Sequence, residues 1–444
     1  MVDILPFKGM RYNPNINLKL EELIAPPYDV ISPDMQDRYY KRNEFNVIRL
    51  ILGRDEANDD EYNNKYTRAA NYLNNWKRDG VLLEDGQKSI YIYQQIYEYP
   101  QSVSKKRTGI ICLVKLEDFK SGGSIYAHEN TFAGPKADRF KLIRTCKANL
   151  CCVFSIYTDT KAKIKKIIDK YTSKKPVTQF ADENSIINKL WLINKKEDTD
   201  VIKEALKNKE IFIADGHHRY ETALNYKNEI RESLKKKPTK PIPSDYVMMY
   251  LTNSESEGLS ILPIHRILND DFGTVADEFL SDLEEAFEIK KFKVSKNVEE
   301  LRERFTTELG QCAGIQTAFG IVMKDGRNFL IKLRDDVDYD DIIEGKISDV
   351  KKALDVTILQ RYVIMQLWVG NPEIELDESE ISFTNDMAEA IEKVLFGKSK
   401  ITFLMNPTPL EKVKGIALAN DRMPQKSTFF YPKLLSGIVL REIK

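Results

Sequence analysis

Histidine is scarce in this sequence: the chain has four among 444 residues, and two of them are neighbours, His217 and His218. Cysteine is scarce too, and the five cysteines form no Cys-x-x-Cys pair, which argues against common zinc and redox motifs. No apolar run approaches the roughly eighteen residues of a membrane-spanning helix. The odd cysteine count and an opening without a signal-peptide pattern predict a cytoplasmic protein outside the membrane.

An excess of charge of either sign is also missing. Lys plus Arg and Asp plus Glu both number 68, so the formal net charge is zero. A general nucleic-acid binder usually carries a visibly basic domain, so a nucleic-acid partner is disfavoured. We therefore expect small-molecule partners, whereas the oligomeric state stays open.

The length of the chain predicts more than one packed unit, because a single hydrophobic core stops growing below 444 residues. Strand and helix patterns alternate without repeats, which predicts an α/β (α+β) protein with a mixed-sheet core. The pattern suggests four parts: an N-terminal segment, a core, a small inserted α/β unit and a C-terminal α/β segment that packs on the core. Their ranges are 1–86, 87–270, 271–348 and 349–444.

Three local patterns predict individual elements. Residues 89–99 and 106–116 are rich in aromatic and β-branched residues, which predicts an antiparallel hairpin. Asp325-Gly326 lies between two apolar stretches and predicts a second hairpin turn. Residues 350–369 show helical periodicity and predict one amphipathic helix.

The stretch Asp-Gly-His-His-Arg, residues 215–219, follows the apolar strand pattern of residues 211–214 and precedes a helical pattern. At such a junction the first N–H groups of the helix are unpaired and attract anions. Gly216 would let a phosphate approach the backbone, and Arg219 could supply a two-pronged contact. The structural alternative is that Asp215 caps the helix.

Adjacent helical residues point about 100 degrees apart, so His217 and His218 are poor joint ligands for one metal. We expect two separate roles, one histidine contacting phosphate and His218 favoured for proton transfer near neutral pH.

A second cluster lies in residues 127–139, where His128 and Glu129 precede a Gly-Pro-Lys turn. His128, Lys136 and Arg139 could add phosphate contacts. Near the C-terminus, the polar residues Arg422, Lys426 and Ser427 predict either a capped turn that closes a domain or a further phosphate-contacting loop.

Carboxylates combined with cations suit phosphoryl transfer, in which acids hold Mg²⁺, cations neutralise developing charge and a base takes the acceptor proton. Asp215 is the candidate Mg²⁺ ligand. Hydrolysis of a phosphate ester would use much the same groups, so transfer and hydrolysis stay open at this point.

Six blocks, in order, resemble a known family: PFKGMRYNP, APPYDVIS, AHENTFAGPKADR, ADGHHRYETAL, FLMNP and RMPQKSTFFYPKLLSG. The chain resembles the bacterial and archaeal domain-of-unknown-function family 1015, over nearly its whole length. That family implies no activity.

The block ADGHHRYETA also resembles the strand-turn-helix signature of the ParB and sulfiredoxin-like superfamily, which includes free-serine kinases with the same Asp-Gly-His-His-Arg string. The resemblance implies a ParB-like core, with residues 215–219 around the phosphates of ATP or ADP and an acid elsewhere, for which Glu129 is the candidate, activating serine. No cysteine adjoins residues 215–219, which disfavours sulfiredoxin chemistry, and the absence of a recognisable helix-turn-helix disfavours DNA spreading.

The working hypothesis is a Mg²⁺- and nucleotide-dependent phosphotransferase that acts on a small hydroxylated metabolite, with free L-serine as the favoured acceptor. A phosphatase for phosphoserine or a similar ester is the first alternative. A nucleotide-binding regulatory module related to ParB proteins is the second.

Overall fold

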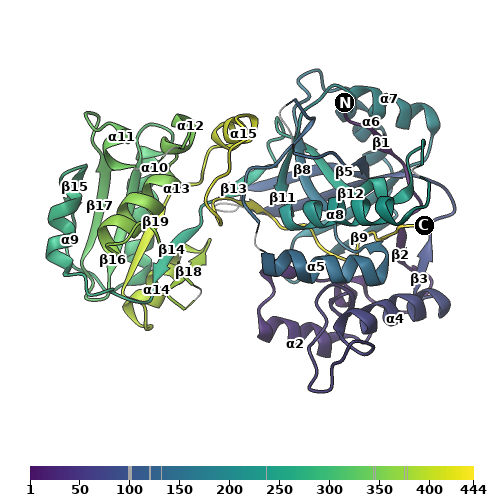
Figure 1. Ribbon diagram of the computed structural model, residues 1–444, viewed down its shortest axis with the longest axis horizontal. Coiled ribbons are helices and arrows are strands. Elements are labelled where there is room, and N and C mark those ends of the chain that lie inside the picture. The colour runs from purple at the N-terminus through teal and green to yellow at the C-terminus, as the bar shows by residue number, and fades with distance from the viewer. Residues whose placement is uncertain are drawn as a thin grey trace. The chain divides into compact units, whose positions relative to one another are not determined.

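The computed structural model describes residues 1–98, 103–119, 122–131, 133–236, 238–343, 345, 347–374, 376–377 and 379–444. Tyr99 and Phe132, which belong to two stretches discussed above, lie outside the described residues. The chain forms two compact units (Figure 1): Met1–Ala127, Thr131–Ser260 and Pro432–Lys444 make the first, and His128–Asn130 and Ile261–Tyr431 make the second. Across the described residues, no helix is long and apolar enough to cross a membrane.

The first unit is built on a mixed sheet, whose nine described strands include β1 beside β5 and otherwise follow the order β6-β11-β8-β12-β5-β4-β10-β9. The pairs β11–β6 and β12–β8 are parallel and the other pairs are antiparallel. The strands are β1 Ile4–Leu5, β4 Ile90–Glu98, β5 Ser104–Lys115, β6 Ile125–Tyr126, β8 Val153–Tyr157, β9 Thr178–Ala181, β10 Ile187–Ile193, β11 Ile211–Asp215 and β12 Tyr246–Asn253.

Helices cover one face of this sheet. Apolar residues of α5, α6, α7 and α8 share one core with alternate residues of the strands, because side chains of a strand point to opposite faces in turn. Figure 1 shows α8 and α5 running beside each other. The helices are α5 Ala133–Cys146, α6 Lys163–Thr172, α7 Lys196–Leu206 and α8 His217–Ser233, with a 3₁₀ turn, η2, at Pro243–Asp245.

The N-terminal part of the first unit packs on α5 through a second core that includes Tyr39, Leu73 and Trp76. Asn64 caps α4 with a capping box, which fixes where that helix starts. The elements are β2 Met10–Tyr12, α1 Leu20–Leu23, η1 Tyr28–Val30, α2 Pro33–Arg42, α3 Ile48–Ile51, α4 Lys65–Arg78 and β3 Leu82–Glu84; β7 Ala148–Asn149 pairs with β21 Arg441–Glu442.

The second unit has an antiparallel sheet in the order β15-β17-β16-β19-β14-β18. One core joins it to α10 and α14, and another joins it to α9 and the π-helical stretch η3. The elements are β13 Ser260–Leu262, β14 His265–Leu268, α9 Ala276–Leu283, β15 Phe287–Lys291, α10 Val298–Cys312, β16 Ala318–Met323, β17 Asn328–Leu333, α11 Tyr339–Ile342, α12 Asp349–Lys352, α13 Asp355–Ile358, η3 Leu359–Trp368, β18 Ile381–Thr384, α14 Met387–Leu395, β19 Ile401–Met405, α15 Leu410–Leu418 and β20 Phe429–Tyr431.

The predicted α/β class with a mixed-sheet core is confirmed, and so are both hairpins, β4–β5 and β16–β17. The single helix predicted for 350–369 is wrong. Leu354 adopts an extended conformation that ends α12 before α13 begins, and the chain then continues as the π-helical stretch η3. The strands β14 to β19 in chain order all belong to one sheet. The four-part division and the ParB-like character of the core stay predictions.

Candidate functional site

The junction between β11 and α8 places the Asp-Gly-His-His-Arg residues at the edge of the first sheet. β11 ends at Asp215, and α8 begins at His217. The N-cap position is Gly216, at φ +91°, and no side chain caps the helix. Asp215 is therefore not the N-cap residue of α8.

Asp215 instead lies between two cations. Its Oδ1 is 3.5 Å from the Lys433 ammonium, and its Oδ2 is 3.1 Å from Nη2 of Arg219. Burial alone would raise the pKa of the Asp215 carboxyl, but Lys433, Arg219 and His217 outweigh burial and hold it below its usual value. Asp29 also acts on Arg219, so two cations and two carboxylates gather at the start of α8.

Arg219 is held in one orientation. Its Nη1 donates to the carbonyl oxygen of Cys152, its Nη2 donates to Asp215, and its side chain is 10% exposed. Its buried Nε has no hydrogen-bond partner among the described residues. A Cβ on Gly216 would lie 2.8 Å from the Arg219 Cζ, so the guanidinium occupies the space predicted for a phosphate over Gly216.

Tyr28 and Asp29, two residues of the APPYDVIS block, also act on Arg139 or Arg219. The Tyr28 ring lies 4.0 Å from the Arg139 guanidinium carbon. Burial raises the pKa of Tyr28, as does Asp29, whereas Arg139 and Arg219 lower it. Burial lowers the pKa of Arg219, but Asp215 and Asp29 outweigh it and keep the guanidinium charged.

Arg139, on α5, is anchored from several sides. Its Nε donates to Asp138 at 2.8 Å, and its Nη1 donates to the carbonyl oxygen of Ile51 at 2.5 Å. Asp138 in turn accepts from the Tyr66 hydroxyl at 2.8 Å and lies 3.5 Å from the Lys65 ammonium. Arg139 is therefore fixed by the start of α4.

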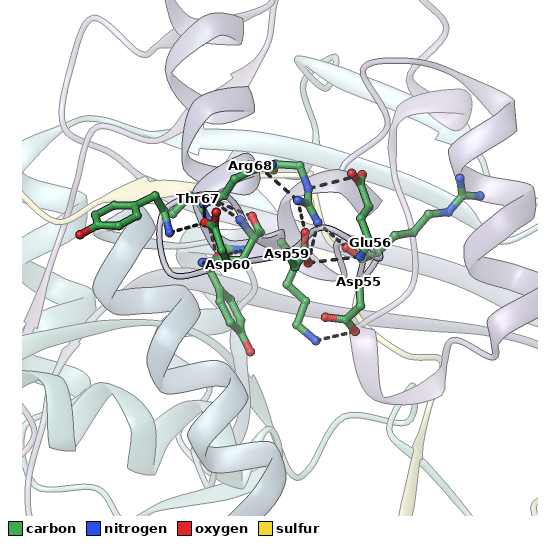
Figure 2. A network of polar contacts seen from close by, with 12 residues as sticks. Asp55, Glu56, Asp59, Asp60, Thr67 and Arg68 are labelled. Atoms are coloured by element: carbon green, nitrogen blue, oxygen red, sulfur yellow. Dashed lines mark hydrogen bonds and ion pairs between the residues drawn. The ribbon is translucent and has the colours of Figure 1, made fainter.

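The loop before α4 is organised by the polar network in Figure 2. Arg68 donates to both carboxylate oxygens of Asp59 and to the carbonyl oxygen of Arg54, while Asp60 accepts from two backbone N–H groups of the loop. Asp55 and Glu56 are exposed, and the hydrogen bonds of the network join residues of the loop and of α4 to one another. The network supports the start of α4, and thereby Lys65 and Tyr66, rather than forming a site of its own.

A cavity of about 50 Å³ lies beside Arg219 and Arg139. Its polar lining includes Thr222, whose buried hydroxyl has no partner among the described residues, and Cys151, whose thiol is 3.0 Å from the Ser436 hydroxyl. The rest of its lining is largely apolar. Such a volume can hold a few water molecules or a small polar group, but not a nucleobase.

The remaining predicted residues fall into both units. In the first unit, His217 is buried, His218 is half-buried, and the Lys136 ammonium lies 3.2 Å from Glu221. His128 and Glu129 belong to the second unit, as do the predicted loop contacts Arg422, Lys426 and Ser427.

Within the second unit, the Thr428 hydroxyl joins His128 and Glu129. His128 Nε2 is 3.2 Å from the Thr428 oxygen, and Thr428 donates to Glu129 at 3.4 Å. The backbone of Met423 donates to the His128 carbonyl oxygen at 2.7 Å. In the predicted loop, Arg422 binds Asp421, and Ser427 donates to the Pro424 carbonyl oxygen and accepts from Thr408 at its own carbonyl oxygen. Lys426 has a positive φ.

The fourth histidine, His265, makes structural contacts. His265 is buried in β14 and accepts a hydrogen bond from the backbone of Met405, and burial lowers its pKa to about 3.

A metal site is not evident. No group of three or more His, Cys, Asp or Glu residues in the described part of the chain could hold a metal ion. Both carboxylate oxygens of Asp215 face cations, so the predicted role of Asp215 as a Mg²⁺ ligand does not fit this arrangement.

Comparison with known proteins gives a family and distant structural neighbours. A family model described as "Protein of unknown function (DUF1015)" matches residues 4–357. The search of curated proteins returns no significant match.

Solved structures match weakly. A free serine kinase mutant in complex with ADP is 12% identical, with 69% of this chain and 84% of that one covered and a TM-score of 0.34. A conserved hypothetical protein from Pyrococcus furiosus is 13% identical, with 70% and 89% covered and a TM-score of 0.32. SbnI with a C-terminal truncation, from Staphylococcus aureus, is 9% identical, with 73% and 85% covered and a TM-score of 0.29. These scores are too low for the superpositions to carry an argument.

Proposed function

The chain belongs to the DUF1015 family, and we propose that it is a nucleotide-dependent phosphotransferase acting on a small hydroxylated metabolite, with L-serine as the favoured acceptor. The observation that carries the proposal is the start of α8, where Lys433 and Arg219 flank Asp215 beside the helix N-terminus. The short Asp-Gly-His-His-Arg resemblance to free-serine kinases adds the choice of serine.

The proposed phosphate site follows from charge and hydrogen bonding. α8 runs from His217 to Ser233, long enough for its N-terminal N–H groups to favour an anion. Arg219 adds a rigid guanidinium with an unused Nε, and Lys433 adds an ammonium. In this proposal, a nucleotide phosphate contacts these groups and Asp215 holds both cations at the required separation.

The histidines complete the proposed phosphate site in different ways. His217 is buried in the first turn of α8 and is assigned to the phosphate contact. His218 is half-buried in the first turn and is assigned to proton transfer, since imidazole exchanges protons near neutral pH.

Activation of the acceptor hydroxyl is assigned to Glu129, as the motif resemblance implies. Supporting this assignment, Glu129 already accepts a hydrogen bond from a hydroxyl group, that of Thr428, whose oxygen also contacts the His128 ring. A general base for phosphoryl transfer makes the same kind of contact with its substrate. The Thr428 hydroxyl thus donates to Glu129 in the way that the acceptor hydroxyl would in this proposal.

Any Mg²⁺ is assigned to the nucleotide phosphates rather than to Asp215, because the Asp215 oxygens already face Lys433 and Arg219. Bound there, Mg²⁺ would neutralise phosphate charge.

The test is phosphorus NMR of the purified chain with MgCl₂, L-serine and either ATP or ADP. The expected result is a phosphoserine resonance that is lost in Arg219→Lys but kept in Arg231→Lys. Arg231 lies on the same helix as Arg219 but outside the site, where it pairs with Asp245. Phosphate released from phosphoserine without nucleotide would favour the phosphatase instead. Nucleotide binding without turnover of any hydroxylated metabolite would leave the regulatory module.

A further inference from the structure

Lys433 contacts Asp215 from a segment whose backbone accepts hydrogen bonds from two side chains of the sheet. The chain re-enters the first unit at Pro432. The Pro432 carbonyl oxygen accepts a hydrogen bond from Nη2 of Arg107, and the Lys433 carbonyl oxygen accepts one from Nε2 of Gln95 at 3.1 Å. Two consecutive carbonyl groups are thus fixed next to the ammonium that faces Asp215.

Arg107 and Gln95 act as a unit because they are direct partners across β5 and β4. Nη2 of Arg107 also donates to Oε1 of Gln95, so each side chain orients the other. Both are buried, at 0% and 1% exposure. Neighbouring strands fix their backbones, and the pair therefore presents its donors in a defined geometry.

The burial of Arg107 is not explained by ordinary core packing. Among the described residues no carboxylate pairs with it, and burial lowers its pKa, which the charge and hydrogen bonding of nearby tyrosines, Tyr250 foremost, only partly offset. Its guanidinium is 4.6 Å from the ring centre of Phe154 and 5.8 Å from that of Tyr250, which offers partial compensation. A buried cation without a counter-ion is expensive, and an apolar side chain would pack there more cheaply.

We propose that Arg107 and Gln95 are positioning residues that act through Lys433: they hold the Pro432–Lys433 backbone so that the Lys433 ammonium stays against Asp215, ready for phosphate. This inference rests on the proposed function only in giving Lys433 a phosphate to bind. The placement of Lys433 itself is a separate property that does not need a nucleotide to be measured.

The first experiment measures the acylation rate of the Lys433 amine by an N-hydroxysuccinimide ester, read by mass spectrometry, without nucleotide. Gln95→Glu keeps a partner for Arg107 but cannot donate to the Lys433 carbonyl, and we expect it to raise the labelling rate about threefold or more through local opening. Arg107→Met should do the same. An unchanged Lys433 rate in both folded variants would overturn the proposal.

Arg266→Met is the matched control for the loss of a buried arginine. Arg266 is fully buried in β14 of the second unit, no carboxylate among the described residues pairs with it, and burial lowers its pKa to about 10. The variant should lose stability as Arg107→Met does, yet leave Lys433 labelling unchanged. An equal increase of the Lys433 labelling rate in Arg266→Met would overturn the proposal, because general destabilisation rather than loss of the Arg107–Gln95 pair would then expose Lys433.

The second experiment is a double-mutant cycle on ADP affinity. Lys433→Met and Gln95→Glu should each weaken binding, by about tenfold for Lys433→Met, and Gln95→Glu should add nothing in the Lys433→Met background. The same factor in both backgrounds would overturn the proposal. Absence of ADP binding in wild type would instead refute the proposed function, while the labelling rates would still decide the role of Arg107 and Gln95.

Discussion

The guanidinium of Arg219 packs directly over the α-carbon of Gly216. A Cβ added to Gly216 would lie 2.8 Å from both Cζ and Nε of Arg219, and Gly216 has a φ of +91°. Glycine is therefore required twice at this position, once by the backbone conformation and once by the arginine above it.

Gly216→Ala should accordingly destabilise the fold and weaken nucleotide binding together. We expect a loss of about 2 kcal/mol or more in the free energy of unfolding, from the left-handed conformation plus the displaced guanidinium. Gly80→Ala separates the two effects, because Gly80 also has a positive φ, +72°, but has no atom within 4 Å of its Cβ position. Equal losses in urea unfolding would show that Arg219 does not press on Gly216.

Asp215→Asn tests whether the carboxylate holds the two cations. The pKa of Asp215 is depressed in the folded protein, so its stabilising effect is complete above the unfolded pKa of about 3.9 and is lost as the pH falls through the folded value. At pH 7 the variant should lose about 2 to 4 kcal/mol, because Arg219 and Lys433 lose their counter-charge.

The difference between wild type and Asp215→Asn should then shrink as the pH is lowered below about 4. Urea unfolding at a series of pH values measures this. A difference that stays constant down to pH 3 would mean that the carboxylate charge does not contribute, and that Asp215 is retained for another reason.

Thr222→Val tests the cavity beside Arg219. The buried Thr222 hydroxyl has no partner among the described residues, so an isosteric apolar replacement should be neutral or stabilising by up to about 1 kcal/mol. Thr252→Val is the control, because the Thr252 hydroxyl donates to the Thr108 carbonyl oxygen at 2.8 Å, and its loss should cost about 1 kcal/mol or more. Similar losses in thermal unfolding would imply a bound partner for Thr222.

Part of this site follows from local sequence pattern. The strand-turn-helix at Asp215 and Gly216 is predictable because an apolar stretch, an Asp-Gly pair and a helical pattern adjoin one another. The β4–β5 hairpin is predictable from the same kind of local signal.

The rest depends on contacts that no local pattern encodes. Lys433 and Tyr28 reach the start of α8 from opposite ends of the chain, and only the folded sheet brings them there. Both residues lie in blocks that carry the family resemblance, APPYDVIS and RMPQKSTFFYPKLLSG, but charge and spacing do not single out Tyr28, Asp29 or Lys433. The sequence pattern does not indicate the helix break at Leu354, because apolar residues on both sides of it preserve a helical period.

Glu129→Gln tests the assignment of the acceptor base. Removing the carboxylate should lower turnover about 10² to 10⁴-fold while leaving ADP affinity unchanged, since the residue would act on the acceptor proton alone. Glu411→Gln, at an exposed position of α15, is the control and should change neither quantity. Phosphorus NMR measures the turnover. Full turnover in Glu129→Gln would remove Glu129 from the mechanism.

The central claim is that the start of α8 binds a nucleotide phosphate, and calorimetric titration with ADP tests it most directly. The account predicts heat of binding in wild type and a loss of affinity of about tenfold or more in Arg219→Lys, because lysine cannot bond to Cys152 and Asp215 and also supply the Nε–H group left for a phosphate. Affinity should be unchanged in Arg231→Lys. No binding by folded wild-type protein, or equal affinity in Arg219→Lys, would contradict it.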